Sequence, residues 1–433
     1  MKNIRFRLIV MNFLSFAVWG AYLTSMGSYL SNAGLGKNIG WFYSIQGIVS
    51  IFMPALMGIV ADKRIPANKL LGICHGIAAI CMFITGYMGM TYGKDVTFAQ
   101  LFIPYTISVA FFMPTIALGN SVSYSALTKA GYDTVKAYPS IRVFGTIGFI
   151  LSMLLVNFLK ADGISFQMTY YQFFVSAIWG IILAVYAFTL PNCDVNRNQG
   201  KTSIVEALGL RAFSLFKDSK MCLFFIFSIF LGVSLQITNG YANPFISSFA
   251  ANDSFKDLFF TKNANLLISL SQLSETLCIL LIPFFLRKYG IKKVMLIAML
   301  AWVLRFAFFG LGDTGSGVWL LILSCIVYGV AFDFFNISGS LFVDKETDES
   351  IRSSAQGLFM MMTNGLGATI GTLSAQAIVN AYTHYQEIDG VGYTVGNTAQ
   401  SWSTVWYIFA GFALVVAVSF AIFFKYKHNP EAK

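Results

Sequence analysis

The chain has 433 residues, of which 57% are hydrophobic and 11% are charged, and its formal net charge is +10. Average proteins carry about 25% charged residues, so this composition, with a mean hydropathy of +0.69, excludes an ordinary soluble protein. Apolar runs long enough to cross a bilayer, roughly 20 residues, recur from end to end. Because these runs are too long and too uniformly apolar for barrel strands, the sequence predicts an all-α polytopic membrane protein.

In chain order, we predict twelve transmembrane helices in two halves. The first half has spans at about 7–32, 38–62, 68–91, 98–127, 141–161 and 166–190. The second half has spans at about 221–250, 263–286, 292–312, 317–343, 353–382 and 402–425. The predicted domains are therefore an N-terminal six-helix bundle (1–190), a cytoplasmic linker (191–220) and a C-terminal six-helix bundle (221–433).

The linker is the clearest change in composition along the chain. Ile204, Leu208, Phe213 and Phe216 recur at roughly helical spacing among charged residues, which predicts an amphipathic helix on the cytoplasmic face. The alternative is an irregular linker.

The basic residues indicate the orientation of the chain in the membrane. Lys and Arg cluster at 2–7, 63–69, 129–136, 197–220, 287–293, 345–352 and in the tail, whereas the loops on the other side carry only Lys37, Lys94, Lys160, Lys256 and Lys262. The positive-inside rule places the rich side, and with it both termini, in the cytoplasm. The positive charge therefore reflects topology and not nucleic-acid binding.

The first apolar run lacks a small-residue cleavage site, so we expect an uncleaved span.

The two halves repeat weakly. Span two and span eight each carry a proline near the end, Pro54 and Pro283, followed by a short basic loop and a further span. Two repeated six-span halves are typical of secondary transporters that bind substrate near the membrane midplane. After span two, Gly58-x-x-x-Asp62-Lys63 resembles the loop signature of the major facilitator superfamily, and we interpret it as a conformational latch between neighbouring helices.

The tenth predicted span contains Asp333 in the middle of an apolar run. A carboxylate at mid-membrane costs about 2.5–3.5 kcal/mol on insertion scales, and such residues usually face a bundle interior and mark a functional site. Tyr328, Phe332 and Asn336 follow at i, i+4 and i+8, so they share one stripe beside the acid. The pattern predicts an aromatic wall, an amide and an acid on one side of a buried helix.

Two further spans carry polar pairs at i, i+3. Gln236 and Asn239 lie in span seven, and Gln272 and Glu275 in span eight. The amides can recognise a substrate through paired donors and acceptors, or they can join helices by hydrogen bonds of about 0.6 kcal/mol each. Glu275 can contact substrate or carry a proton, or it can form a structural ion pair with Arg142 or Arg305.

Span five places Arg142, Thr146 and Phe149 on one helical face. Arg142 and Thr146 can line the cavity, or Arg142 can lie at the cytoplasmic edge and snorkel. We interpret Arg305 in span nine as a structural residue, which either pairs with a buried acid or contacts a lipid headgroup. His75 in span three is a lone imidazole, and we assign it no proton-relay role.

No catalytic or metal-binding pattern occurs in the sequence. There is no nucleophile elbow, no phosphate-binding glycine loop and no cluster of metal ligands. The six cysteines show no paired spacing, so we expect them to be reduced. The sequence predicts no enzyme and no cofactor.

Almost the whole chain resembles the bacterial nucleoside permeases, which are nucleoside:proton symporters of the major facilitator superfamily. The matching runs are FMPALMGIVADK (52–63), IRVFGTIGF (141–149), LQITN (235–239), SQLSETL (271–277), AFDFFNISGS (331–340), SAQGLFMMMTNG (354–365) and FKYKH (424–428). Two features depart from the family pattern: the external stretch 384–401 is longer, and Ser234 stands where some members have an acid.

The resemblance implies proton-coupled import of purine or pyrimidine nucleosides across the bacterial cytoplasmic (inner) membrane by alternating access. It implies proton coupling at Asp333 and Glu275, and we expect a monomer in the lipid bilayer. The nucleoside contacts that it implies are Arg142, Thr146, Phe149, Gln236, Asn239, Gln272, Glu275, Tyr328, Phe332 and Asp333. The alternatives are transport of another small polar solute, such as a sugar, and a non-transporting sensor.

Overall fold

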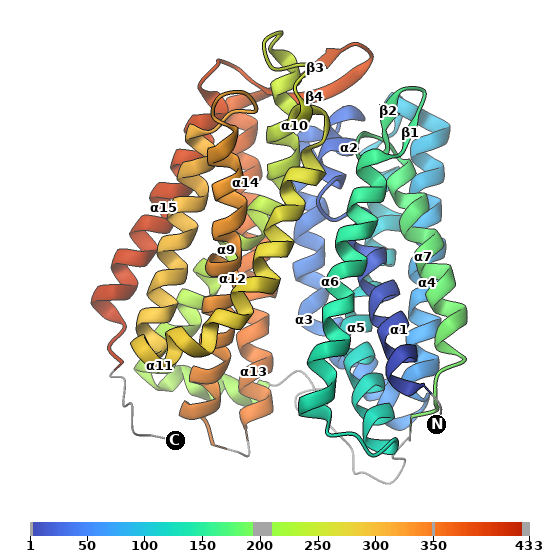
Figure 1. Cartoon of the computed structure of the whole chain (residues 1–433), viewed down its shortest axis with the longest axis vertical. Coiled ribbons are helices and arrows are strands. Elements are labelled where there is room, and N and C mark those ends of the chain that lie inside the picture. The colour runs from blue at the N-terminus through green and yellow to red at the C-terminus, as the bar shows by residue number, and fades with distance from the viewer. Residues whose placement is uncertain (1–2, 194–209, 349–350, 427–433) are drawn as a thin grey trace. The chain divides into compact units, whose positions relative to one another are not determined.

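The computed structural model describes residues 3–193, 210–348 and 351–426, with side chains except at 62, 63, 135, 210, 211, 352 and 353. The chain forms two compact units (Figure 1): Met1–Asn38 with Ile48–Leu208, and Ile39–Gly47 with Gly209–Lys433. Among the described residues, eight helices are long and apolar enough to cross a membrane. The prediction of an all-helical, multi-pass membrane protein is therefore confirmed.

Among its described residues, the first unit contains seven α-helices, of which α3 gives its first residues to the second unit. They are α1 (Ile4–Gly20), α2 (Met26–Asn32), α3 (Ile39–Lys63), α4 (Ala67–Tyr92), α5 (Phe98–Lys129), α6 (Thr134–Phe158) and α7 (Tyr171–Ala187). Short 3-10 turns lie at η1 (Gly36–Asn38), η2 (Gly93–Asp95) and η3 (Phe166–Met168). The predicted first span, 7–32, is divided by a turn at 21–25.

Close packing of α1 against α6 positions one part of the candidate site. A Cβ added at Gly148 of α6 would overlap the carbonyl oxygen of Phe13, and one added at Gly20 of α1 would overlap that of Phe149. Small residues let membrane helices approach at backbone distance. The face of α6 that carries the predicted site residues is thereby fixed against α1.

The second unit contains the remaining helices. They are η4 (Leu210–Lys217), α9 (Ser219–Ser248), η5 (Phe249–Ala251), α10 (Phe259–Lys262), α11 (Ala264–Leu311), α12 (Val318–Glu346), α13 (Arg352–Met360), η6 (Met361–Gly367), α14 (Ala368–Tyr382) and α15 (Ser401–Phe423). η6 is a π-helical segment that continues from α13 into α14. α11 packs against both α12 and α15, and α9 packs against η6 and α14.

A break inside α11 matches the boundary expected from the sequence. Gly290 has φ 75° and ψ 167°, which is not helical, and it divides the element within the basic loop predicted between spans eight and nine. Glycine accepts a positive φ without the steric penalty of other residues. The two parts of α11 correspond to the predicted spans 263–286 and 292–312.

Two short β-hairpins, which the sequence analysis did not predict, add to the helices. β1 (Lys160–Ala161) pairs with β2 (Ile164–Ser165), and β3 (Thr383–Ile388) pairs with β4 (Val391–Gly396), both antiparallel. Each turn is an Asp-Gly pair with positive φ, Asp162–Gly163 and Asp389–Gly390, the usual chemistry of a two-residue hairpin. The stretch 384–401, which is longer than the family pattern, therefore begins as the β3–β4 hairpin, at the end of α14 (Figure 1).

The predicted linker helix is only partly described. Ile204 and Leu208 lie outside the described residues. The rest forms η4, where Phe213 stacks on Phe216 at 5.7 Å and Phe216 contacts Phe225 of α9 at 5.2 Å between ring centroids. Of the predicted latch, Gly58 lies in α3, whereas the side chains of Asp62 and Lys63 lie outside the described residues. The latch stays a prediction.

Candidate substrate and proton site

The acid on α12 is buried and incompletely satisfied. Asp333 is 4% exposed, and its Oδ2 has no hydrogen-bond partner among the described residues. It interacts electrostatically with Glu275 of α11, which is half-buried. Two carboxyl groups in a desolvated site cannot both ionise cheaply. The pair is therefore chemically suited to hold and release a proton.

Beside this acid pair lies a stack of aromatic rings. The rings of Tyr328 and Phe332 are nearly parallel, 9° apart, with centroids 5.9 Å apart. Trp302 of α11 meets Tyr328 edge-on at 5.9 Å and 88°. Tyr328 is 4% exposed and Phe332 is half-buried. The stripe predicted on α12 is thus a packed aromatic face, suited to stacking against a planar ligand.

The amides predicted on α9 are joined to each other. Asn239 Nδ2 donates to Gln236 Oε1 at 2.6 Å. Gln236 is buried and Asn239 half-buried. Gln272 lies half-buried on α11, one turn before Glu275. All these groups belong to the second unit.

The first unit holds the three residues predicted on α6. The Arg142 guanidinium lies over the ring of Phe16 of α1, 3.8 Å from its centroid. Phe149 is 5% exposed and meets the edge of Trp19 at 6.3 Å and 85°. Thr146 is half-buried between them on the same helix. Phe16 was not identified from the sequence, because nothing local marks one phenylalanine in an apolar helix as the partner of a distant arginine.

One expectation for the second unit is wrong. Arg305 was expected to pair with a buried acid or to reach a headgroup. It is 2% exposed, and no described carboxylate lies within ion-pair distance of it. Its Nη1 donates instead to the Ser324 carbonyl at 2.7 Å and to Ser271 Oγ at 3.4 Å. Its guanidinium carbon lies 4.5 Å from the Tyr328 ring centroid.

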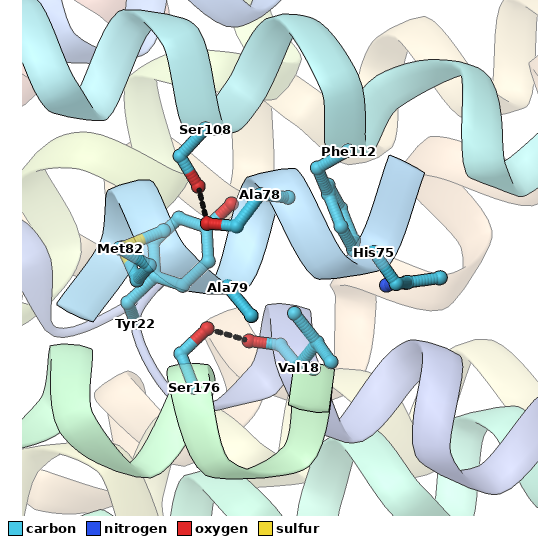
Figure 2. Close-up of a pocket in the computed structure, with 10 residues that line it drawn as sticks. Val18, Tyr22, His75, Ala78, Ala79, Met82, Ser108, Phe112 and Ser176 are labelled. Atoms are coloured by element: carbon cyan, nitrogen blue, oxygen red, sulfur yellow. Dashed lines mark hydrogen bonds between the residues drawn. The ribbon is translucent and has the colours of Figure 1, made fainter. Parts of the chain in front are cut away.

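A pocket beside His75 in the first unit (Figure 2) is too small to hold a nucleoside. Its volume is about 10 Å³, room for about one water molecule. The two serine hydroxyls in its wall are already bonded to backbone: Ser108 donates to the Ala78 carbonyl at 2.7 Å and Ser176 to that of Val18 at 2.8 Å. None of the predicted contact residues lines this pocket.

Comparison with known proteins identifies the family. The profile described as "Nucleoside H+ symporter" matches residues 1–429. The chain is 46% identical to the xanthosine permease of Escherichia coli over 432 residues, covering 99% of this chain and 98% of the relative. It is 44% identical to the nucleoside permease NupG of the same organism, covering 98% and 97%. The chain therefore belongs to the nucleoside H+ symporter family.

Solved structures agree with this assignment. The crystal structure of NupG superposes with a TM-score of 0.85 at 44% identity, covering 98% of this chain and 100% of that one. A D-xylose-proton symporter shares the fold, with a TM-score of 0.69 at 14% identity, covering 97% of each chain.

Proposed function

We propose that this protein imports nucleosides together with protons, without chemical change to the nucleoside. The relatives with 44–46% identity are a xanthosine permease and a nucleoside permease. The observation that carries the proposal is the buried carboxyl of Asp333 on a membrane-capable helix, which interacts electrostatically with Glu275. In a symporter of this family, such a pair gives the proton a place to bind.

The proposed architecture has twelve spans in two halves, 1–190 and 221–433. Twelve result when α1 and α2 count as one span, α11 as two, and α13, η6 and α14 as one. The distribution of Lys and Arg supports cytoplasmic termini. We place the protein in the bacterial cytoplasmic membrane as a monomer.

The proposed nucleoside contacts come from both halves. Arg142, Thr146 and Phe149 come from the first. Gln236, Asn239, Gln272, Glu275, Tyr328, Phe332 and Asp333 come from the second. Aromatic faces stack on the base, at about 1–3 kcal/mol per base, and the amides and acids bind the ribose hydroxyls and the base edges. Protonation of the acid pair from outside removes a buried charge, and deprotonation toward the cytoplasm accompanies release of the substrate.

The proposed cycle is alternating access, with the substrate held near the midplane. The Gly58, Asp62 and Lys63 signature supports a latch at the cytoplasmic end of α3, because its carboxylate and ammonium can pair with groups on a neighbouring helix.

The test is uptake of radiolabelled uridine and adenosine into proteoliposomes, with and without an inward proton gradient. Accumulation above equilibrium that a protonophore abolishes is the expected result. Gradient-independent equilibration would contradict proton coupling. Saturable binding without flux would indicate a sensor, and flux of sugars in place of nucleosides would overturn the substrate assignment.

A further inference from the structure

Arg305 of α11 is a buried cation, and no acidic side chain among the described residues pairs with it. Its side chain is 2% exposed, and its guanidinium donates to the Ser324 carbonyl and the Ser271 hydroxyl and also interacts with the Cys325 thiol. Its Nε has no hydrogen-bond partner within the described residues. An arginine inside a membrane helix is costly, and such residues are retained where they have a function. The function of Arg305 is therefore to be sought in what its charge faces.

The charge lies over two aromatic rings, Phe309 of its own helix at 5.2 Å and, nearer, Tyr328 of the proposed binding site. The guanidinium carbon lies 4.5 Å from the centroid of Tyr328, well within the distance of a cation–π interaction. Trp302, three residues earlier on α11, contacts the same ring edge-on at 5.9 Å. Two side chains of one helix thus define both the position and the tilt of Tyr328.

Tyr328 in turn supports the next ring on α12. Phe332 is parallel to it within 9° at 5.9 Å, and Phe332 is more exposed than Tyr328. Tyr328 also interacts electrostatically with Glu275 and Asp333. The contacts therefore run from the buried cation through a buried ring to the more accessible ring of Phe332.

We infer that Arg305 is a positioning residue that holds the Tyr328–Phe332 face at the angle at which it stacks on the nucleobase. The inference rests on the proposed function, and it adds a residue outside the predicted contacts. Since Arg305 acts through the ring and not on the ribose, it affects binding according to the base that a nucleoside carries.

A purely structural role would give a different result. The backbone of Arg305 is already tied to α12, because Ser324 Oγ donates to the Arg305 carbonyl at 2.9 Å. That bond joins the two helices without touching Tyr328. Ser324→Ala is therefore a matched control that weakens the helix pair and leaves the cation on the ring.

The experiment measures the Kd of uridine and adenosine by calorimetry for the full-length protein and its variants. We expect Arg305→Met to weaken binding by about tenfold and to change the uridine-to-adenosine Kd ratio by at least about threefold. Arg305→Lys, which keeps the charge but not the planar group, should recover part of the loss. Ser324→Ala should lower the melting temperature and leave the ratio unchanged.

A double-mutant cycle with Tyr328→Leu decides whether the effect passes through the ring. In that background Arg305→Met should change Kd by less than about twofold, because the ring it positions is gone. The inference is overturned if Arg305→Met weakens binding equally with and without Tyr328→Leu. It is also overturned if Arg305→Met lowers the stability but leaves the uridine-to-adenosine Kd ratio unchanged. If Arg305→Met does not fold, Arg305→Lys takes its place in the cycle.

Failure of the proposed function would give a different result from failure of the positioning role. A wild-type protein that folds but binds neither nucleoside contradicts nucleoside transport. The positioning role is then tested by structure determination of the Arg305 variant. A Tyr328 ring that stays in place without the guanidinium overturns it.

Discussion

The side-chain amide of Asn239 donates a 2.6 Å hydrogen bond to Oε1 of Gln236, one turn earlier on α9. This bond fixes the rotation of both amides and leaves the Gln236 Nε2 to donate and the Asn239 Oδ1 to accept. A pair of this kind is pre-organised, so a polar ligand need not order it on binding.

Replacing Asn239 should therefore weaken nucleoside binding. Asn239→Leu removes an acceptor and frees Gln236 to rotate, and we expect Kd to rise about 2- to 10-fold, the value of one neutral hydrogen bond. Calorimetry with uridine measures it. The control is Thr238→Val, since the Thr238 hydroxyl is bonded to the Leu235 carbonyl at 3.2 Å. Unchanged affinity in Asn239→Leu would show that the pair only joins helices.

Neutral amides in place of the acid pair should separate binding from proton coupling. Asp333→Asn and Glu275→Gln keep the shape of each side chain but cannot release a proton. For the residue that carries the proton, we expect gradient-driven accumulation to fall to equilibrium level while exchange of labelled for unlabelled nucleoside continues.

The control for these variants is an acid on α12 that does not belong to the pair of Asp333 and Glu275. Asp344 is exposed near the end of α12, and Asp344→Asn should accumulate nucleoside like the wild type. If Asp333→Asn and Glu275→Gln both keep full accumulation, neither acid carries the coupled proton.

Patterns within single helices were predicted well from the sequence. Spacing of i, i+4 and i, i+3 predicted that Tyr328 shares a face with Phe332, and Gln236 with Asn239. The hydrogen bond between the two amides was not predicted. The division of α11 follows from a basic loop around a glycine. Each of these signals depends only on residues close together in the chain.

Features that depend on distant residues were not predicted. The guanidinium of Arg142 lies over Phe16 of another helix, and Arg305 lies over Tyr328 and pairs with none of the described acids. Hydropathy carries no information about which apolar ring a cation meets. The turn at 21–25 was also missed, because a span that stays apolar through a turn looks the same as a continuous helix.

The β3–β4 hairpin should depend on an ion pair that does not titrate near neutral pH. Lys256 pairs with Asp389 in the β3–β4 turn, and this hydrogen bond with the opposite charge raises the pKa of Lys256. Because the pKa of the lysine is raised, the stability that the ion pair gives to the hairpin is complete below the ordinary lysine pKa of roughly 10.4. That stability is lost only as the pH rises through the pKa of Lys256 in the folded protein.

Lys256→Gln should increase hydrogen exchange in residues 383–396, relative to wild type, by the same factor at about pH 6 and about pH 9, after correction for intrinsic rates. Lys262→Gln is the matched control, because Lys262 forms an ion pair with Asp257 at 2.8 Å. A factor that shrinks between the two pH values would mean that the Lys256 ammonium titrates in this range.

Close packing of α9 against η6 should tolerate no side chain at Gly232. An added Cβ there would overlap the Thr363 carbonyl oxygen and lie 2.7 Å from its carbon. Overpacking of this kind costs about 1–3 kcal/mol, so Gly232→Val should lower the melting temperature in detergent by several degrees.

The control is Gly411 of α15, which has nothing within 4 Å of an added Cβ. Gly411→Ala should therefore melt at or slightly above the wild-type temperature, since alanine is the better helix former. Equal melting temperatures for the two variants would mean that the helices separate at little cost, and that their contact does not hold α9 in place.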